Sequence, residues 1–127
     1  EALEHRTDCR IEHANYGDDY YAMVMLESYI ALAPRGQGAA SFRFFEAMAL
    51  GVVPFYISDM DSRPFAKFLD WEICSLWTKD ASSLSATLDS YDKQALLKMG
   101  EMAKRTYDDH LAYGKWEKYT LRELELL

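Results

Sequence analysis

The sequence has few of the residues that form covalent cross-links or sharp breaks in a chain. Its 127 residues include two cysteines, three prolines and six glycines. Cys9 and Cys74 are too few and too widely spaced for a disulfide framework or a zinc site, so we expect both to be buried free thiols. No apolar run approaches the roughly 18 residues of a membrane-spanning helix, and no signal peptide is visible. The sequence therefore predicts no disulfide scaffold and no membrane segment in this chain.

Basic residues are also scarce, with 14 Lys and Arg against 21 Asp and Glu, which gives a net charge of −7. This balance argues against a nucleic-acid partner, because nucleic-acid-binding domains usually carry a basic face. A phosphate ligand remains compatible with it if the pocket is locally positive, and Arg35 and Arg43 can supply that charge. Hydrophobic residues make up 50% of the chain and charged residues 28%, a composition typical of one globular domain.

Strands and helices alternate along the sequence. We expect strands at 9–14, 29–33, 52–57 and 73–77, and helices at 1–7, 20–28, 42–50, 64–69, 80–90, 92–112 and 116–127. This alternation predicts an α/β fold with a Rossmann-like parallel sheet and helices on both faces. Four strands are fewer than the roughly six of a complete doubly wound domain, and the sequence begins without methionine. We therefore expect this chain to be a fragment of a longer protein.

The segment from Pro34 to Asp59 is the most informative part of the sequence. It predicts a strand end, a glycine-containing loop, a short helix ended by Gly51 and a second strand, a unit that gathers backbone N–H groups where open α/β sheets bind phosphates. The Ser41 hydroxyl can cap the helix. Arg43 and Glu46 share a helix face, either as an ion pair contributing about 0.2–0.5 kcal/mol or as ligands of a diphosphate and a ribose. The pattern alone favours the ion pair.

Several short motifs follow one another in a specific order. They are P-R-G at 34–36, S-F-R-F-F-E-A at 41–47, G-V-V-P at 51–54, S-D at 58–59, P-F at 64–65 and D-W at 70–71. Their order resembles the exostosin family (glycosyltransferase family 47), in which they lie in the C-terminal half of a two-domain GT-B enzyme. The resemblance covers roughly residues 20–77. The chain departs from the family at Phe55, usually valine or isoleucine there, and in the loop at 37–40.

The resemblance implies that residues 1–127 form a single nucleotide-sugar-binding domain of a glycosyltransferase. Its donor would be a uridine diphosphate sugar, transferred with inversion to a glycan acceptor. The residues implied in donor binding are Arg35, Gly36, Gly38, Ser41, Arg43 and Glu46. Arg43 would also be catalytic, because negative charge grows on the leaving phosphate. An N-terminal acceptor-side domain outside this chain would supply the general base, so that this chain alone would be inactive. The family often works in the Golgi lumen, whereas a bacterial or viral relative would be cytoplasmic.

Other interpretations of the sequence remain. Asp59-Met60-Asp61 has the D-x-D pattern with which GT-A glycosyltransferases bind a divalent metal, but two carboxylates at this spacing are frequent by chance and GT-B enzymes usually need no metal. We therefore expect no metal site and no cofactor besides the donor, and Asp59 to end the strand. The alternative function is a non-catalytic nucleotide- or phosphate-binding Rossmann-like module. A purely structural interaction domain would show no nucleotide affinity.

Overall fold

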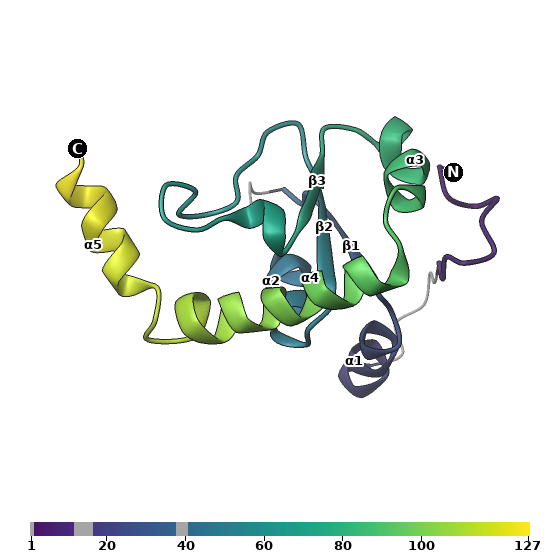
Figure 1. The fold of residues 1–127 in the computed structure, drawn as a ribbon, viewed down its shortest axis with the longest axis horizontal. Coiled ribbons are helices and arrows are strands. Elements are labelled where there is room, and N and C mark those ends of the chain that lie inside the picture. The colour runs from purple at the N-terminus through teal and green to yellow at the C-terminus, as the bar shows by residue number, and fades with distance from the viewer. Residues whose placement is uncertain (1, 12–16, 38–40) are drawn as a thin grey trace.

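Three parallel strands form the sheet at the centre of the domain (Figure 1). The computed structural model describes residues 2–11, 17–37 and 41–127. Within them the sheet order is β1 (Ile30–Pro34), β2 (Val53–Ile57) and β3 (Leu76–Thr78). The registers pair Leu32 of β1 with Phe55 of β2 and Phe55 with Leu76 of β3. The parallel arrangement confirms the predicted Rossmann-like α/β class.

Helices lie in the connections between the strands and in the C-terminal third of the chain. The α-helices are α1 (Asp18–Leu26), α2 (Phe42–Ala49), α3 (Leu84–Asp89), α4 (Lys93–Thr106) and α5 (Glu117–Glu125), the 3₁₀ helices are η1 (Trp71–Ile73) and η2 (Ala81–Ser83), and η3 (Tyr107–Leu111) is a π-helical turn. In Figure 1, α5 extends from the end of the domain opposite the N-terminus. No helix within the described ranges is long and apolar enough to span a membrane.

Side chains alternate between the two faces of the sheet, and helices cover both. On one face, Ala33 and Tyr56 pack with Phe44 and Met48 of α2. The opposite face has a separate core, whose buried members are Leu3, Val53, Phe55, Leu76, Leu84 and Leu96. This second core includes side chains from α3 and from the first half of α4. The prediction of helices on both faces is therefore confirmed.

Pro54 lies in the central strand without losing a hydrogen bond to β3. The Val53 N–H donates to the Tyr29 carbonyl oxygen on the β1 side at 3.1 Å. Because successive residues of a strand point to opposite neighbours, the nitrogen of Pro54 faces the side of β3. The β3 pairing begins one residue later, at Phe55. The proline therefore stands where no ladder donor is needed.

Glycine ends α2 as predicted and lets α4 approach closely. Gly51 has φ 76°, the left-handed conformation expected after a helix. Gly100 in α4 packs against it so tightly that an added Cβ would lie 2.3 Å from the Gly51 carbonyl oxygen. Because Gly51 precedes β2, this contact fixes α4 at the amino edge of the sheet, away from the carboxyl edge of the predicted site.

Some predicted elements are wrong. Residues 2–5 form a turn instead of a helix, and residues 9–11 are irregular, while 12–16 lie outside the described residues. The expected helix at 64–69 is a turn, because Phe65 has φ 56°, which interrupts helical geometry. The strand predicted from residue 73 begins at Leu76, after η1.

Burial also differs from the expectation at two places. A continuous apolar run such as 29–33 predicts a strand buried on both faces, but β1 is an edge strand of the described sheet and Ala33 is its only fully buried residue. Of the two free cysteines, Cys74 is buried as predicted whereas Cys9 is half-buried. Burial raises the pKa of the Cys74 thiol to about 11, so this thiol stays protonated at neutral pH.

Candidate functional site

Arg43 and Glu46 both meet Tyr21, a residue that the sequence interpretation missed. Both lie on the exposed side of α2. The Tyr21 hydroxyl donates a hydrogen bond to Glu46 Oε2 at 2.9 Å, and Arg43 Cζ lies 5.8 Å from the centre of the Tyr21 ring. Burial of the phenol, followed by the Glu46 hydrogen bond, raises the pKa of Tyr21. The ion pair expected between Arg43 and Glu46 is absent from these described residues, which share Tyr21 instead.

Apolar packing of α1 on α2 explains how Tyr21 reaches these side chains. Met25 of α1 is buried in a cluster with Ala47 of α2 and Val52. Tyr21 precedes Met25 by four residues, so both lie on the same face of α1. The signal was therefore present in the sequence as a helical spacing, but only the packing of α1 against α2 shows which residues Tyr21 contacts.

Arg35 lies at the carboxyl edge of the sheet, beside Asp59. Arg35 follows β1, Asp59 follows β2, and Arg35 Nη1 forms an ion pair with Asp59 Oδ1. The Arg35 N–H also donates to the Ile57 carbonyl oxygen at 2.9 Å. The guanidinium of Arg35 lowers the pKa of the Asp59 carboxyl. A guanidinium carries five N–H donors, so this pairing leaves donors of Arg35 available to a further anion.

Of the remaining predicted residues, Gly36 and Ser41 are described and precede α2 in the chain. Ser41 is the N-cap residue, but its side chain makes no capping hydrogen bond, contrary to the expectation. Gly36 is exposed, and a Cβ added there would meet nothing within 4 Å, so the folded chain itself gives no steric reason for glycine. Gly38 lies outside the described residues.

The two carboxylates of the D-x-D pattern are bound by different arginines. Asp61 is paired with Arg63, whose Nε and Nη2 donate to it at 2.8 and 2.7 Å, and this pairing lowers the pKa of Asp61. Asp59 is paired with Arg35. No group of three or more His, Cys, Asp or Glu side chains suited to a metal ion occurs among the described residues. The arrangement thus provides two separate ion pairs.

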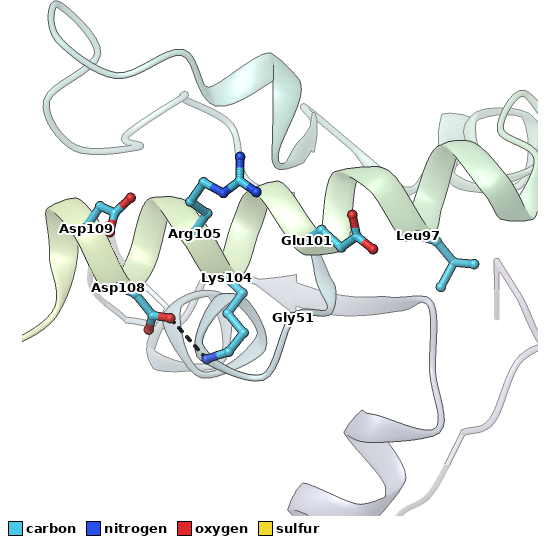
Figure 2. A pocket seen from close by; sticks show the side chains of 7 residues that line it. All are labelled: Gly51, Leu97, Glu101, Lys104, Arg105, Asp108 and Asp109. Carbon is cyan, nitrogen blue, oxygen red and sulfur yellow. Dashed lines mark hydrogen bonds and ion pairs between the residues drawn. The ribbon is translucent and has the colours of Figure 1, made fainter.

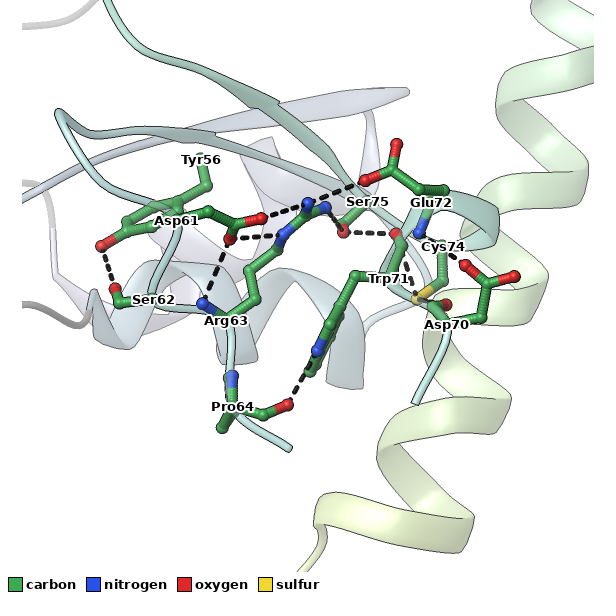
Figure 3. Close-up of polar contacts among 10 residues, drawn as sticks. All are labelled: Tyr56, Asp61, Ser62, Arg63, Pro64, Asp70, Trp71, Glu72, Cys74 and Ser75. Atoms are coloured by element: carbon green, nitrogen blue, oxygen red, sulfur yellow. Dashed lines mark hydrogen bonds and ion pairs between the residues drawn. The ribbon is translucent and has the colours of Figure 1, made fainter. Parts of the chain in front are cut away.

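Arg63 is the centre of a polar network beneath the loop that follows β2 (Figure 3). Its side chain is only 5% exposed. Besides Asp61, it donates to Ser75 Oγ at 2.9 Å and to Glu72 Oε1 at 2.8 Å. The indole of the neighbouring Trp71, which is buried, donates to the Pro64 carbonyl oxygen at 2.7 Å. This network holds the loop carrying Asp59 against η1.

An open hollow of about 410 Å³ lies elsewhere, along α4 (Figure 2). Its lining residues are Gly51, Leu97, Glu101, Lys104, Arg105, Asp108 and Asp109. Lys104 is already paired with Asp108 at 3.1 Å. Since Gly51 precedes β2, the hollow is at the amino edge and does not include the predicted donor-binding residues.

The structure therefore brings the predicted residues together in two groups. Arg43 and Glu46 meet at Tyr21 on the exposed side of α2, and Arg35 meets Asp59 at the ends of neighbouring strands. Parallel strands place their carboxyl ends at one edge of the sheet. From the sequence, this rule could have predicted that Asp59, which follows β2, lies beside Arg35, which follows β1.

Comparison with known proteins relates this chain to one family. The sequence profile described as "Exostosin GT47 domain" matches residues 1–89. The chain is 31% identical to the Exostosin-1 homolog of Caenorhabditis elegans over 105 residues, which cover 81% of this chain and 28% of that protein. It is 26% identical to Exostosin-1a of Danio rerio over 121 residues, which cover 94% of this chain and 16% of that protein. The chain thus spans less than a third of the length of these relatives.

Proposed function

This chain belongs to the Exostosin GT47 domain family, and we propose that it is the donor-binding half of a glycosyltransferase that uses a nucleoside diphosphate sugar. The supporting observation is the position of Arg43 and Glu46, solvent-accessible and one helical turn apart near the start of α2. A cation suited to a diphosphate and a carboxylate suited to a ribose diol are thereby presented from one helix beside the carboxyl edge of the sheet.

In this proposal each polar group has a separate role toward the donor. Arg35 and Arg43 neutralise the diphosphate, assisted by the Ser41 hydroxyl and by the backbone N–H groups at the start of α2. A Cβ added at Gly36 would meet nothing within 4 Å, so the phosphates can approach the backbone there. Glu46 accepts hydrogen bonds from the ribose hydroxyls, and we assign uridine as the nucleoside.

Arg43 also acts during the proposed reaction. In an inverting transfer, an acceptor hydroxyl attacks the anomeric carbon while the nucleoside diphosphate leaves with its bonding electron pair. Negative charge grows on the leaving phosphate, so a guanidinium placed there stabilises the transition state more than the ground state. This is the basis on which we propose Arg43 as a catalytic residue.

We propose that a second domain completes the enzyme. It would bind the glycan acceptor and supply the general base, and the cleft between the two domains would orient the reactants and exclude water. The matches cover only 28% and 16% of the two relatives, which is consistent with this division. Purified residues 1–127 are therefore expected to transfer no sugar in a radiolabelled-donor assay. Robust turnover by this chain alone would show that the division into two domains is wrong.

Uridine diphosphate binding tests the proposal directly. At about 100 times the dissociation constant, the nucleotide should stabilise the fold by roughly 2.7 kcal/mol, or several degrees in Tm, without added metal. Arg43→Ala should abolish most of this shift, while Arg105→Ala, which removes an exposed arginine from α4, should retain it. A shift that requires manganese and disappears in Asp61→Asn would favour the D-x-D interpretation. No shift with any nucleoside diphosphate would exclude a donor site on this chain.

A carboxylate at position 46 is the second requirement. Glu46→Gln keeps the shape of the side chain but leaves the ribose hydroxyls poorly matched, and should weaken nucleotide binding by about 1–3 kcal/mol. The free energy of unfolding should barely change, since Glu46 is exposed. Calorimetry that finds equal affinity for the variant and the parent chain would remove Glu46 from the site.

A further inference from the structure

Tyr21 contacts two proposed donor-binding residues at once, although it comes from a different helix. Its hydroxyl donates to Glu46 Oε2 at 2.9 Å. Its ring lies 5.8 Å from Arg43 Cζ, within the range of a cation–π contact. One aromatic side chain therefore restrains both the carboxylate and the guanidinium that α2 presents to solvent.

The position of Tyr21 is set by buried apolar contacts. Met25, four residues later on the same face of α1, is 5% exposed and packs with Ala47 and Val52. Ala47 directly follows Glu46 in α2. The anchor of α1 is therefore next to the residue that Tyr21 contacts, and the phenol is held against Glu46 by the fold.

The hydrogen bond from Tyr21 favours one orientation of the Glu46 carboxylate toward a ligand. Exposed Glu side chains are mobile, and ordering one on binding has an entropic cost. The Tyr21 hydroxyl donates to Oε2 and so restrains the carboxylate, whose other lone pairs remain as acceptors. In the same way, the ring face restricts the guanidinium of Arg43 to one side of α2.

We propose that Tyr21 is a positioning residue for donor recognition, which orients Glu46 toward the ribose hydroxyls and Arg43 toward the diphosphate. This inference rests on the proposed function, and it adds a residue of α1 to the nucleotide site. Pre-orienting both groups lowers the cost of ordering them when the nucleotide binds. The hydroxyl and the ring of Tyr21 can be removed one after the other, which makes their contributions measurable.

Paired nucleotides test the hydroxyl contact. Tyr21→Phe keeps the ring and removes the donor to Glu46, so uridine diphosphate should bind about 2- to 10-fold more weakly. The affinity for 2′,3′-dideoxyuridine diphosphate, which has no ribose hydroxyls for Glu46, should not change. Tyr113→Phe removes a hydroxyl from a side chain that is 98% exposed and serves as the matched control, with no effect on either ligand.

A second variant tests the ring. Tyr21→Leu removes the aromatic face as well, so it should weaken the binding of the dideoxy nucleotide about 2- to 5-fold where Tyr21→Phe does not. In the double variant Tyr21→Phe/Glu46→Gln, the loss for uridine diphosphate should not exceed that of Glu46→Gln alone, because the two residues act as one unit.

The possible results separate this inference from the proposed function. If the parent chain binds uridine diphosphate and Glu46→Gln weakens it, but Tyr21→Phe does not, the positioning role is wrong and the donor site remains. Equal weakening of both nucleotides by Tyr21→Phe would mean a general structural effect and would also overturn it. If the parent chain binds neither nucleotide, the proposed function fails together with this inference.

Discussion

Arg35 and Asp59 form an ion pair that joins the carboxyl ends of β1 and β2. The Arg35 side chain is 35% exposed and the Asp59 side chain 73% exposed, so the pair lies at the surface. Such a pair contributes little to the free energy of folding. Its importance is electrostatic, because Asp59 places a negative charge beside an arginine that we propose to bind phosphate.

Asp59→Asn should therefore strengthen nucleotide binding. The substitution removes one negative charge beside the proposed diphosphate site, so Kd should fall by about two- to fivefold. Calorimetric titration with uridine diphosphate at low ionic strength measures the effect, which should decrease as salt is added. Glu101→Gln makes the same change in net charge on α4 and should leave Kd unchanged. An unchanged Kd in Asp59→Asn would place Arg35 outside the phosphate site.

Gly100→Ala should destabilise the domain. At an exposed helical position, this change would favour the helix by about 1 kcal/mol. Here the new Cβ would lie 2.3 Å from the Gly51 carbonyl oxygen, so the backbones of α4 and of the α2–β2 turn must separate. We expect a net loss of about 1–3 kcal/mol in urea unfolding. Gly36→Ala, where the Cβ meets nothing within 4 Å, should change the free energy of unfolding by less than about 0.5 kcal/mol.

Arg63→Met should show how much the polar network of Figure 3 contributes. Methionine can occupy the buried path of the side chain but leaves Asp61 without its partner, for an expected loss of about 1–3 kcal/mol in the free energy of unfolding. Glu72→Gln removes the other carboxylate of the network. Its side chain is 80% exposed, so the loss should stay below about 1 kcal/mol. Equal losses in the two variants would contradict this account of the network.

The Asp61 ion pair should make stability depend on pH in the acid range. Arg63 holds the folded-state pKa of Asp61 below its ordinary value of 3.8, so the stabilisation is fully present above that value. It is lost as the pH falls through the lower folded-state pKa. The difference in free energy of unfolding between the parent chain and Asp61→Asn should be constant from neutral pH to about pH 5 and shrink below about pH 4. Asp109→Asn, at an exposed position of η3, provides the control, and a difference that grows on acidification would reverse the sign argued here.

The sequence alone predicted features that depend on a few neighbouring residues. The stop of α2 at Gly51 is confirmed, because a left-handed glycine acts within one turn of chain. The order of strands and helices around β1 and β2 follows from apolar periodicity. The ordered motifs from Pro34 to Trp71 indicated the exostosin family, and the family comparison confirms it.

Only the tertiary structure decided which distant side chains meet. Tyr21 and Glu46 are 25 residues apart, and Arg35 and Asp59 are 24 apart. The local pattern of Arg43 and Glu46 favoured an ion pair within α2, whereas packing of α1 supplied Tyr21 as the common partner. The structure also decided the conformation of Phe65. Its φ of 56° interrupts the segment 64–69, whose composition predicted a short helix. Its ring packs 5.4 Å from that of Tyr119 in α5. Local conformation follows from short-range sterics. Side-chain partners depend on how whole elements pack, and this packing joins residues far apart in the sequence that local patterns do not identify.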